Sequence, residues 1–425
     1  MRGQSDEYLQ PNKRITRCVK RLTAIDTLTG RVIWKTDKVY PQHFYPLTIK
    51  DYCYAIKNAV IDGIDTLPIL SISMKDFPYC DFKCVDCLAC PSREWAIRDR
   101  NIKYPIIPIE MYKNILKEIS NYSQLRGVKQ VRFEICGEGN PDLYKYRKEM
   151  IEYASKECGM GIVYVSTGSK FTSDLIDMLV NYASCIRISF PGINKEAYDV
   201  YSGQEEANHF SYEDAINLLH KLSEARKKVG RQNQLLIGTR TCIRKLNAGS
   251  YEDFIRTIGA LSIDAFQGVK VLTPDFAEHE DEMIDTKTIK ELLGLKENYK
   301  NFGIQSFQIP MYLDSTYNNR SLDYSRRPSQ CWSSLVSPIM YGTNVIACAH
   351  WDKITNPRYH YGIMEGRQFE LEEIMHGNSA KIIAENCPKK CRDCCSYNDN
   401  AFMETLWRSL RTYSTPENVE FFFDY

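Results

Sequence analysis

Three cysteines, Cys80, Cys84 and Cys87, lie close together with the spacing C-x3-C-x2-C. Thiolates at this spacing can bind three irons of one cubic iron–sulfur cluster and leave the fourth iron without a protein ligand. A small molecule can then bind that iron, just as an open coordination position separates catalytic zinc sites from structural ones. The spacing therefore predicts a catalytic cluster at Cys80, Cys84 and Cys87.

Three other interpretations of this stretch stay open. The run Cys84–Pro91 also looks like part of a ferredoxin motif, C-x2-C-x2-C followed by proline, but no further cysteine follows Cys90 until Cys136. A C-x2-C pair is the usual signal of a zinc knuckle. The thiols can also be buried side chains without any metal.

The chain has sixteen cysteines, four at positions 80–90, four at 387–395 and eight scattered singly. An exported chain would use them for disulfides, but we find no signal peptide at the N-terminus, and this favours metal or thiol chemistry. Because the two groups lie on either side of a barrel-sized region, we expect two metal sites.

Composition sets the general class of the protein. Of 425 residues, 43% are hydrophobic and 26% are charged, which is typical of a globular protein with one large domain and one or two small ones. The net charge of +1 indicates neither nucleic acid nor an anionic membrane as a partner. No apolar stretch is long enough to span a membrane, and we expect a soluble, cytoplasmic protein.

The elements that must position the first cysteine group are alternating strands and helices. A helical pattern covers Ile109–Ile119, and another begins at Thr286. The predicted strands are Leu70–Met74, Val131–Ile135, Ile162–Val165, Cys185–Phe190, Leu235–Ile243 and Phe266–Pro274. Strands alternating with helices predict parallel βαβ units, and six of them make a partial (β/α)6 TIM-type barrel. The cysteine loop follows the first strand, at the end of the barrel where such folds keep their chemistry.

Alternation along the strands predicts which side chains face the barrel lumen. In Val131–Ile135 the apolar residues should pack outward against the helices, which leaves Arg132 and Glu134 in the lumen. The strand Cys185–Phe190 turns Arg187 inward in the same way. Arg132, Glu134 and Arg187 are therefore candidate substrate contacts.

From about Leu70 to Pro274, the cysteine motif and the segments after it resemble the radical S-adenosylmethionine (radical SAM) superfamily. The resemblance implies that S-adenosylmethionine (SAM) binds the open iron of a 4Fe–4S cluster through its amine and carboxylate. One electron, from a reductant such as flavodoxin or ferredoxin, then cleaves SAM to methionine and a 5′-deoxyadenosyl radical. This radical removes a hydrogen atom from the substrate.

The resemblance also implies contacts to SAM after the second predicted strand. Cys136–Pro141 looks like the family's Gly-Gly-Glu-Pro segment, which holds the amino group of the methionine moiety. Gly137 and Gly139 permit positive φ and let a ligand approach the backbone. Asn140 stands where the family has an acid, so its carbonyl would accept the hydrogen bond without the charge, and Glu138 would compensate.

Later strands carry further expected contacts. The turn that begins at Ser166 is similar to the family's Thr-Asn-Gly turn, and Ser189 matches a serine that the family often places against the methionine carboxylate. Ser189 can also be a satisfied strand hydroxyl. Arg240 is a candidate clamp for the carboxylate of SAM or for substrate, or else one half of a structural ion pair. Asp86 replaces the usual aromatic residue before the third cysteine, so Phe82 would have to supply the adenine surface.

The C-terminal cysteines resemble the SPASM or shorter Twitch extension, which carries auxiliary 4Fe–4S clusters. Cys331, Gly342 and Cys348 read as C-x10-G-x5-C, one residue longer than usual before the second cysteine, with Gly342 turning a short hairpin. Six cysteines are too few for the usual two clusters, so we expect one auxiliary cluster. Its expected ligands are Cys331, Cys348, Cys391 and Cys394, with Cys387 as an alternative to Cys391. Zinc is the alternative metal.

We expect three regions: an N-terminal extension over residues 1–69, the barrel over 70–310 and a small cysteine-rich iron–sulfur domain over 311–425. The extension should contain a hairpin over Thr23–Thr36 and a short helix over Tyr52–Ile61. A helix from Phe402 should be followed by an aromatic tail.

The substrate class is not fixed by these motifs. A single auxiliary cluster favours oxidation, dehydration or epimerisation of a small-molecule or sugar-type intermediate. The alternative is a maturase for a ribosomal precursor peptide or protein, with residues 1–69 as a docking surface. A hypothesis of another class is a non-catalytic iron–sulfur electron carrier.

Overall fold

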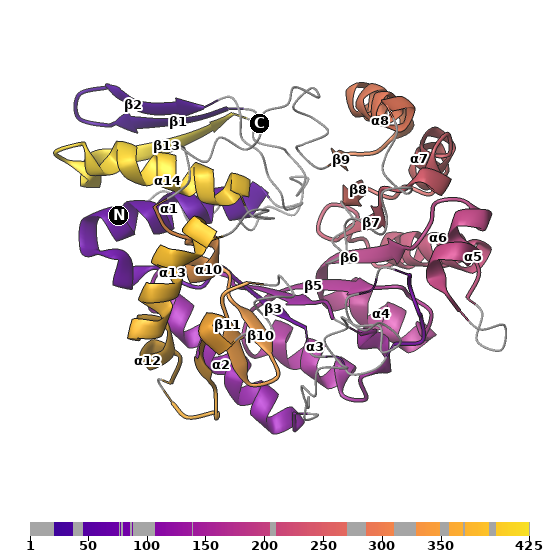
Figure 1. Cartoon of the computed structure of the whole chain (residues 1–425), viewed down its shortest axis with the longest axis horizontal. Coiled ribbons are helices and arrows are strands. Elements are labelled where there is room, and N and C mark those ends of the chain that lie inside the picture. The colour runs from indigo at the N-terminus through magenta and orange to yellow at the C-terminus, as the bar shows by residue number, and fades with distance from the viewer. Residues whose placement is uncertain are drawn as a thin grey trace.

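The structure is a computed structural model of the whole chain (Figure 1). The residues described are 21–36, 46–75, 77, 80–85, 87, 107–137, 139–204, 210–269, 286–309, 329–348, 357–368, 370–390 and 397–424. Within these ranges, no helix is both long enough and apolar enough to cross a membrane.

A ten-stranded sheet forms the centre of the molecule, in the order β12-β11-β10-β3-β4-β5-β6-β7-β8-β9. Its middle strands are β3 (Ser71–Met74), β4 (Arg132–Ile135), β5 (Gly161–Ser166), β6 (Ala183–Phe190), β7 (Leu236–Cys242), β8 (Ala265–Val269) and β9 (Ser306–Gln308). Each is parallel to its neighbour. The six predicted strands correspond to β3–β8, which confirms the predicted parallel order; residues 270–274 of the last prediction lie outside the described ranges.

Helices connect these strands in sequence and make βαβ units. They are α2 (Ile109–Gln124), α3 (Arg147–Lys156), α4 (Ser173–Tyr182), α5 (Lys195–Ser202), α6 (Tyr212–Lys228), α7 (Tyr251–Ala260) and α8 (Thr286–Asn298). The helices predicted over Ile109–Ile119 and from Thr286 are confirmed as α2 and α8. Ser211 begins α6 with a capping box, in which its side chain accepts from the amide of Asp214 and the Asp214 carboxylate accepts from the amide of Ser211.

The two faces of the sheet differ as the alternation predicts. Phe133, Ile135, Ile186 and Ile188 are fully buried in the main core together with residues of the helices. Burying each such side chain contributes about 1.5–3 kcal/mol. The other face, here called the inner face, carries Arg132, Glu134, Arg187 and Ser189 and a small apolar cluster of its own, made of Cys136, Val163, Val165, Cys185, Leu236 and Ala265.

The C-terminal part of the chain extends the same sheet, and this was not predicted. β10 (Ile339–Tyr341) pairs parallel with β3, and β11 (Asn344–Ile346) and β12 (His360–Ile363) follow it antiparallel. The predicted hairpin at Gly342 is confirmed, since Gly342 has a φ of 61° between β10 and β11. The helices of this part are α10 (Trp332–Val336), α12 (Glu370–His376), α13 (Asn378–Lys390) and α14 (Tyr397–Arg411).

The two ends of the described chain meet in a second sheet. The predicted hairpin is confirmed as β1 (Arg21–Asp26) and β2 (Val32–Thr36), and the expected short helix is the longer α1 (Pro46–Asp62). β1 also pairs antiparallel with β13 (Val419–Asp424), so the expected aromatic tail is a strand. Figure 1 shows β1, β2 and β13 together beside α14 and α1, at the opposite side of the view from α7 and α8.

Candidate active site

The first cysteine group lies just past β3, at the carboxyl edge of the parallel strands. Cys84 is close to both other thiols: burial raises its pKa well above the usual value, and the charges of Cys87 and Cys80 raise it further, while Arg244 lowers it. The amide of Cys87 donates to the carbonyl of Cys84 at 3.0 Å. None of the three forms a disulfide.

This donor set is compatible with a cubic cluster, while Cys90, the partner of Cys87 in the zinc-knuckle alternative, lies outside the described residues. Among the described residues, no group of three or more His, Cys, Asp or Glu side chains is spaced to hold one metal ion. In a cubic cluster, each thiolate binds a different iron, so its sulfur ligands stand farther apart than those around one ion. Three thiols that act electrostatically on one another, beside the cation Arg244, are compatible with an anionic cluster.

Backbone contacts attach the cysteine loop to the end of α5. The amide of Lys83 donates to the carbonyl of Ser202 at 3.0 Å, and the amide of Val85 donates to that of Tyr201 at 3.3 Å. These carbonyls belong to the last turn of α5. Carbonyl groups at that position have no hydrogen-bond donor within the helix. Gly203 ends α5 with a φ of 57°, and a Cβ there would lie 2.3 Å from the carbonyl oxygen of Lys83.

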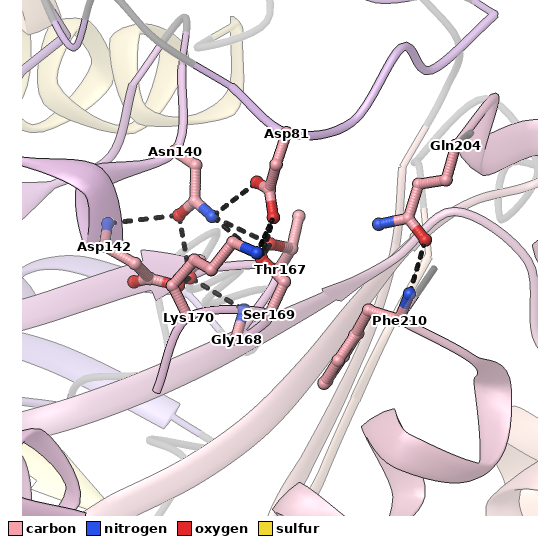
Figure 2. A network of polar contacts seen from close by, with 10 residues as sticks. Asp81, Asn140, Asp142, Thr167, Gly168, Ser169, Lys170, Gln204 and Phe210 are labelled. Carbon is pink, nitrogen blue, oxygen red and sulfur yellow. Dashed lines mark hydrogen bonds and ion pairs between the residues drawn. The ribbon is translucent and has the colours of Figure 1, made fainter. Parts of the chain in front are cut away.

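A side-chain network attaches the same loop to the turns after β4 and β5 (Figure 2). The amide of Asn140 donates to Oδ1 of Asp81 at 2.9 Å, and Oγ of Ser169 donates to Oδ2 of Asp81 at 2.5 Å. Nζ of Lys170 lies 3.9 Å from the same carboxylate. Because Asp81 lies between Cys80 and Cys84, these bonds fix the part of the loop that presents the thiols.

Asn140 is the centre of this network. Its amide nitrogen also donates to Oγ1 of Thr167 at 3.2 Å, while its Oδ1 accepts from the amide of Asp142 at 3.1 Å and from Oγ of Ser166 at 3.2 Å. Only 2% of Asn140 is exposed. Both ends of its side chain are thus engaged with the protein, and a direct contact of this side chain with SAM stays a prediction.

Ser166 and Asp142 continue the network inward. Oγ of Ser166 donates to Oδ2 of Asp142 at 2.6 Å and accepts from the amide of Gly168 at 2.8 Å, and the hydroxyl of Tyr164 donates to Oδ1 of Asp142 at 3.0 Å. Burial raises the pKa of Asp142 to about 6, although the bonds from Ser166 and Tyr164 lower it. Asp81 and Asp142 were not predicted from the sequence, although the turn sequence Asn140-Pro141-Asp142 was an available signal.

The glycines after β4 are only partly as predicted. Gly137 does not use the positive φ that a glycine permits; a side chain is excluded there by space, because a Cβ would lie 2.5 Å from Cδ2 of Phe77. The left-handed glycine of this region is Gly168, with a φ of 79° in the turn after β5. Gly139 is partly exposed, and Glu138 lies outside the described residues.

Ser189 and Arg240 are brought side by side. They are register partners on β6 and β7, and both are partly exposed. Burial lowers the pKa of Arg240, and the charge of Arg187 lowers it further. The structure therefore places the two expected carboxylate contacts at one level of the inner face.

Glu134 and Arg187 form an ion pair across the inner face. Ser73 donates to Oε2 of Glu134 at 2.7 Å, and Nη1 of Arg187 donates to Oε1 of Gln267 at 3.0 Å. Burial would raise the pKa of Glu134, but the charges of Arg187 and Arg132 hold it well below its usual range. These two candidate substrate contacts are thus held together.

Two other predicted residues, Arg132 and Phe82, make contacts within the protein. Nη2 of Arg132 donates to Oγ of Ser71 at 3.1 Å, and its charge also acts on Asp51, whose pKa burial raises to about 7. Phe82 is 4% exposed, and its ring packs edge-on against Tyr198, with 6.5 Å between centroids. Most of the Phe82 ring is therefore part of the core, and adenine binding there stays a prediction.

Only part of the second cysteine group is described. Cys331 is 8% exposed, accepts at Sγ from Nδ2 of Asn400 at 3.8 Å, and donates through its amide to the carbonyl of Ala384 in α13 at 2.8 Å. Cys348, two residues after β11, is partly buried. The side chain of Cys387 and residues 391–396, with Cys391 and Cys394, lie outside the description.

Comparisons with known proteins agree with this fold. No family model matches the sequence, and no curated protein is similar to it. Streptococcus suis SuiB bound to S-adenosylmethionine superposes with a TM-score of 0.56 at 13% identity, over 89% of this chain and 82% of SuiB. SuiB bound to precursor peptide SuiA gives 0.54 at 13% identity, over 82% of this chain and 74% of SuiB.

A second protein gives a similar result. Native anSMEcpe with bound AdoMet superposes with a TM-score of 0.55 at 16% identity, over 82% of this chain and 98% of anSMEcpe. At such identities the likeness is one of fold. This chain therefore shares its fold with two proteins that were solved with SAM bound.

Proposed function

We propose that this protein is a radical SAM enzyme, in which β3–β8 and their helices form a partial (β/α)6 barrel. The observation that carries the proposal is the convergence of Cys80, Cys84 and Cys87 at the carboxyl edge of the parallel sheet. The shared fold with two proteins that bind SAM supports it independently.

In this proposal the three thiols hold a 4Fe–4S cluster with one open iron. When bound, the cluster and SAM supply one-electron cleavage of a sulfonium bond and a 5′-deoxyadenosyl radical. The protein supplies the geometry: Asp81 and the α5 end fix the loop, and Arg244 offsets the negative charge gathered at Cys84.

The residues that orient SAM are proposed from their position. Ser189 is the proposed donor to the methionine carboxylate, which its partial exposure on the inner face supports. The backbone around Gly137 and Gly139, next to the Asn140 network, is proposed to accept from the amino group, with Glu138 beside it. Ser166 and Asn140 act through this network by holding the turns in place.

The inner face below this edge is the proposed substrate site. Glu134 and Arg187 hold each other and are joined to Ser73 and Gln267, so their positions are set before substrate binds. Such preorganised polar groups can hold a substrate in one orientation. Arg132 supports Glu134 electrostatically from the deeper end of β4.

For the substrate, we retain a small-molecule or sugar-type intermediate, with a peptide as the second candidate. The peptide gains support because SuiB and anSMEcpe were each solved with a peptide bound. We also propose one auxiliary 4Fe–4S cluster on Cys331, Cys348, Cys391 and Cys394, with Cys387 as an alternative and zinc as the other metal. Flavodoxin or ferredoxin is the proposed type of reductant.

The decisive experiment is reductive cleavage of SAM by the anaerobically reconstituted full-length protein. We expect 5′-deoxyadenosine without added substrate, and its loss in a Cys84→Ala variant. Cys158→Ala is the matched control, because Cys158 is also buried, with 4% exposure, but lies between α3 and β5. If the wild-type protein binds iron through the three cysteines but forms no 5′-deoxyadenosine, the electron-carrier hypothesis replaces the enzyme.

A further inference from the structure

One arginine of the inner face differs from the other two. Arg187 donates to Glu134 and to Gln267, and Arg132 donates to Ser71. For Arg240, no hydrogen-bond acceptor and no ion-pair partner exists among the residues that the structure describes. A guanidinium has five N–H donors, so Arg240 has donors available for a ligand.

Arg240 is also open to that face. Along β7, Thr239 and Thr241 on the outer side are 0% and 2% exposed, whereas Arg240 is partly exposed. Its register partners on the two neighbouring strands, Ser189 and Gln267, are partly exposed as well. Three polar side chains at one level of the sheet are therefore accessible from the same side.

Charges of both signs act on Arg240, whereas the inner face as a whole carries more cations than carboxylates. Lys75, Arg132 and Arg187 all act on Glu134, and Arg187 also acts on Arg240. Glu134 also acts on Arg240, but its charge is already shared with Arg187, to which it is ion-paired, and with Arg132 and Lys75. Cations held close together and partly out of water attract an anion.

Ser189, the register partner of Arg240, is the proposed donor to the iron-bound carboxylate of SAM, but two observations favour a different anion for Arg240 itself. The side chains whose charges act on Cys84 include Arg244 and Cys242 but not Arg240. Arg240 precedes Cys242 by two residues on the same face of β7, which places it about 7 Å farther from the carboxyl edge. Arg244 is thus the cation beside the three thiols, whereas Arg240 lies farther from the carboxyl edge of the sheet.

We propose that Arg240 binds an anionic group of the substrate, a carboxylate or a phosphate, on the inner face of the sheet. A guanidinium binds either group through two parallel hydrogen bonds. That the ligand is the substrate rests on the proposed function, but the binding of an anion does not. The expected substrate therefore carries a carboxylate or a phosphate. That group lies two residues of β7 farther from the carboxyl edge than the reacting end of SAM.

The test uses thermal unfolding of the full-length, cluster-reconstituted protein with inorganic phosphate or malonate as probes, against sodium chloride at equal ionic strength. A ligand that binds the folded state raises the unfolding temperature. We expect stabilisation of the wild type by one of the two anions, and a dissociation constant about tenfold or more weaker in Arg240→Gln. Arg240→Lys should give an intermediate value, because it keeps the charge but loses the paired donors.

Arg256→Gln is the matched control. Arg256 lies on α7, is 58% exposed and pairs with Glu252, so this variant should bind the anions like the wild type. SAM binding is measured by equilibrium dialysis on the same variants, and Arg240→Gln should keep the wild-type affinity for SAM. Unchanged anion binding in Arg240→Gln, or no stabilisation of the wild type by either anion, would overturn the proposal.

The remaining outcomes separate this proposal from the proposed function. If Arg240→Gln loses SAM and anion binding together, the arginine belongs to the SAM site and the substrate assignment is overturned. If the wild type forms no 5′-deoxyadenosine but still binds the anion through Arg240, the enzyme proposal fails while the anion site is supported.

Discussion

Two polar clusters lie at the carboxyl half of the same sheet, and they are built in opposite ways. Around Asn140, buried groups satisfy one another: Asp81, Asp142 and Ser166 each have partners inside the cluster. On the inner face, charges of one sign predominate and Arg240 has no acceptor among the described residues. A satisfied buried network makes a region rigid, whereas an incomplete and accessible one is suited to bind a ligand.

The largest effect is expected where the inner face is already paired. Replacing Glu134 by Gln leaves Arg187, whose side chain is only 6% exposed, without its counter-charge. Breaking a buried pair in this way should lower the free energy of unfolding by about 3 kcal/mol. Urea denaturation measures it; Glu252→Gln, in the exposed pair on α7, should change the same quantity by less than about 0.5 kcal/mol. Equal losses in both variants would show that Glu134 and Arg187 are not a buried pair.

The Asn140 cluster is broken by removing its centre. Asn140→Ala removes the amide that joins Asp81 to the turns after β4 and β5, and leaves a buried carboxylate short of donors. We expect a loss of about 2–3 kcal/mol in unfolding free energy and a lower iron content, because the cysteine loop is released. Asn181→Ala, which removes an exposed bond within α4, is the control. Full iron content in Asn140→Ala would refute a role in positioning the loop.

Asp142 makes the same cluster sensitive to pH. Its pKa is about 6 in the folded protein against 3.8 as the ordinary value, so the folded state binds the proton more tightly. The stabilising contribution is therefore complete below about pH 4 and is lost as the pH rises through 6, on the order of 2–3 kcal/mol. The difference in unfolding free energy between wild type and Asp142→Asn, measured from pH 4 to 7.5, should show this decline. A pH-independent difference would mean that the carboxyl group titrates normally.

The smallest expected loss of stability tests whether the end of α5 holds the cysteine loop. Gly203→Ala places a Cβ in the left-handed region and against the carbonyl of Lys83, so it should cost about 1–2 kcal/mol and also lower iron retention. Gly230→Ala has the same backbone requirement, with a φ of 70°, but no atom within 4 Å. It should lower stability by less than Gly203→Ala, because it adds no overlap with neighbouring atoms, and should leave the iron content unchanged. Identical iron loss in both variants would show that the contact between Gly203 and Lys83 has no special role in iron retention.

Local patterns in the sequence predicted the sheet but not its edges. The strands β4 and β6 were found because apolar and polar residues alternate in them, and the same alternation gave the correct faces for Glu134 and Arg187. The three-residue strands β9 and β10 are too short to show a period. The pairing of β1 with β13 joins segments almost four hundred residues apart, as in the register of Ala24 with Phe421, and nothing local indicates it.

The candidate site shows the same limit. The cysteine spacing is a local signal, and so is the position of Ser189 and Arg240 on the inner face. The bond from Asn140 to Asp81 spans 59 residues and depends on how the turns after β4 and β5 approach the cysteine loop. Sequence similarity pointed to Asn140 as a contact to SAM, whereas its neighbours in space show a side chain that is already used to hold the loop.

The position of β10 has a consequence for the growing chain on the ribosome. β3, which leads into the cysteine loop, bonds through the amides of Leu70 and Lys75 to the carbonyls of Val336 and Met340 at 2.7 and 3.1 Å. Until those later residues are synthesised, that edge of β3 has no strand beside it. We therefore expect iron uptake at the first cysteine group to follow synthesis of residues 336–340, and a nascent chain stalled at residue 310 should take up little iron there.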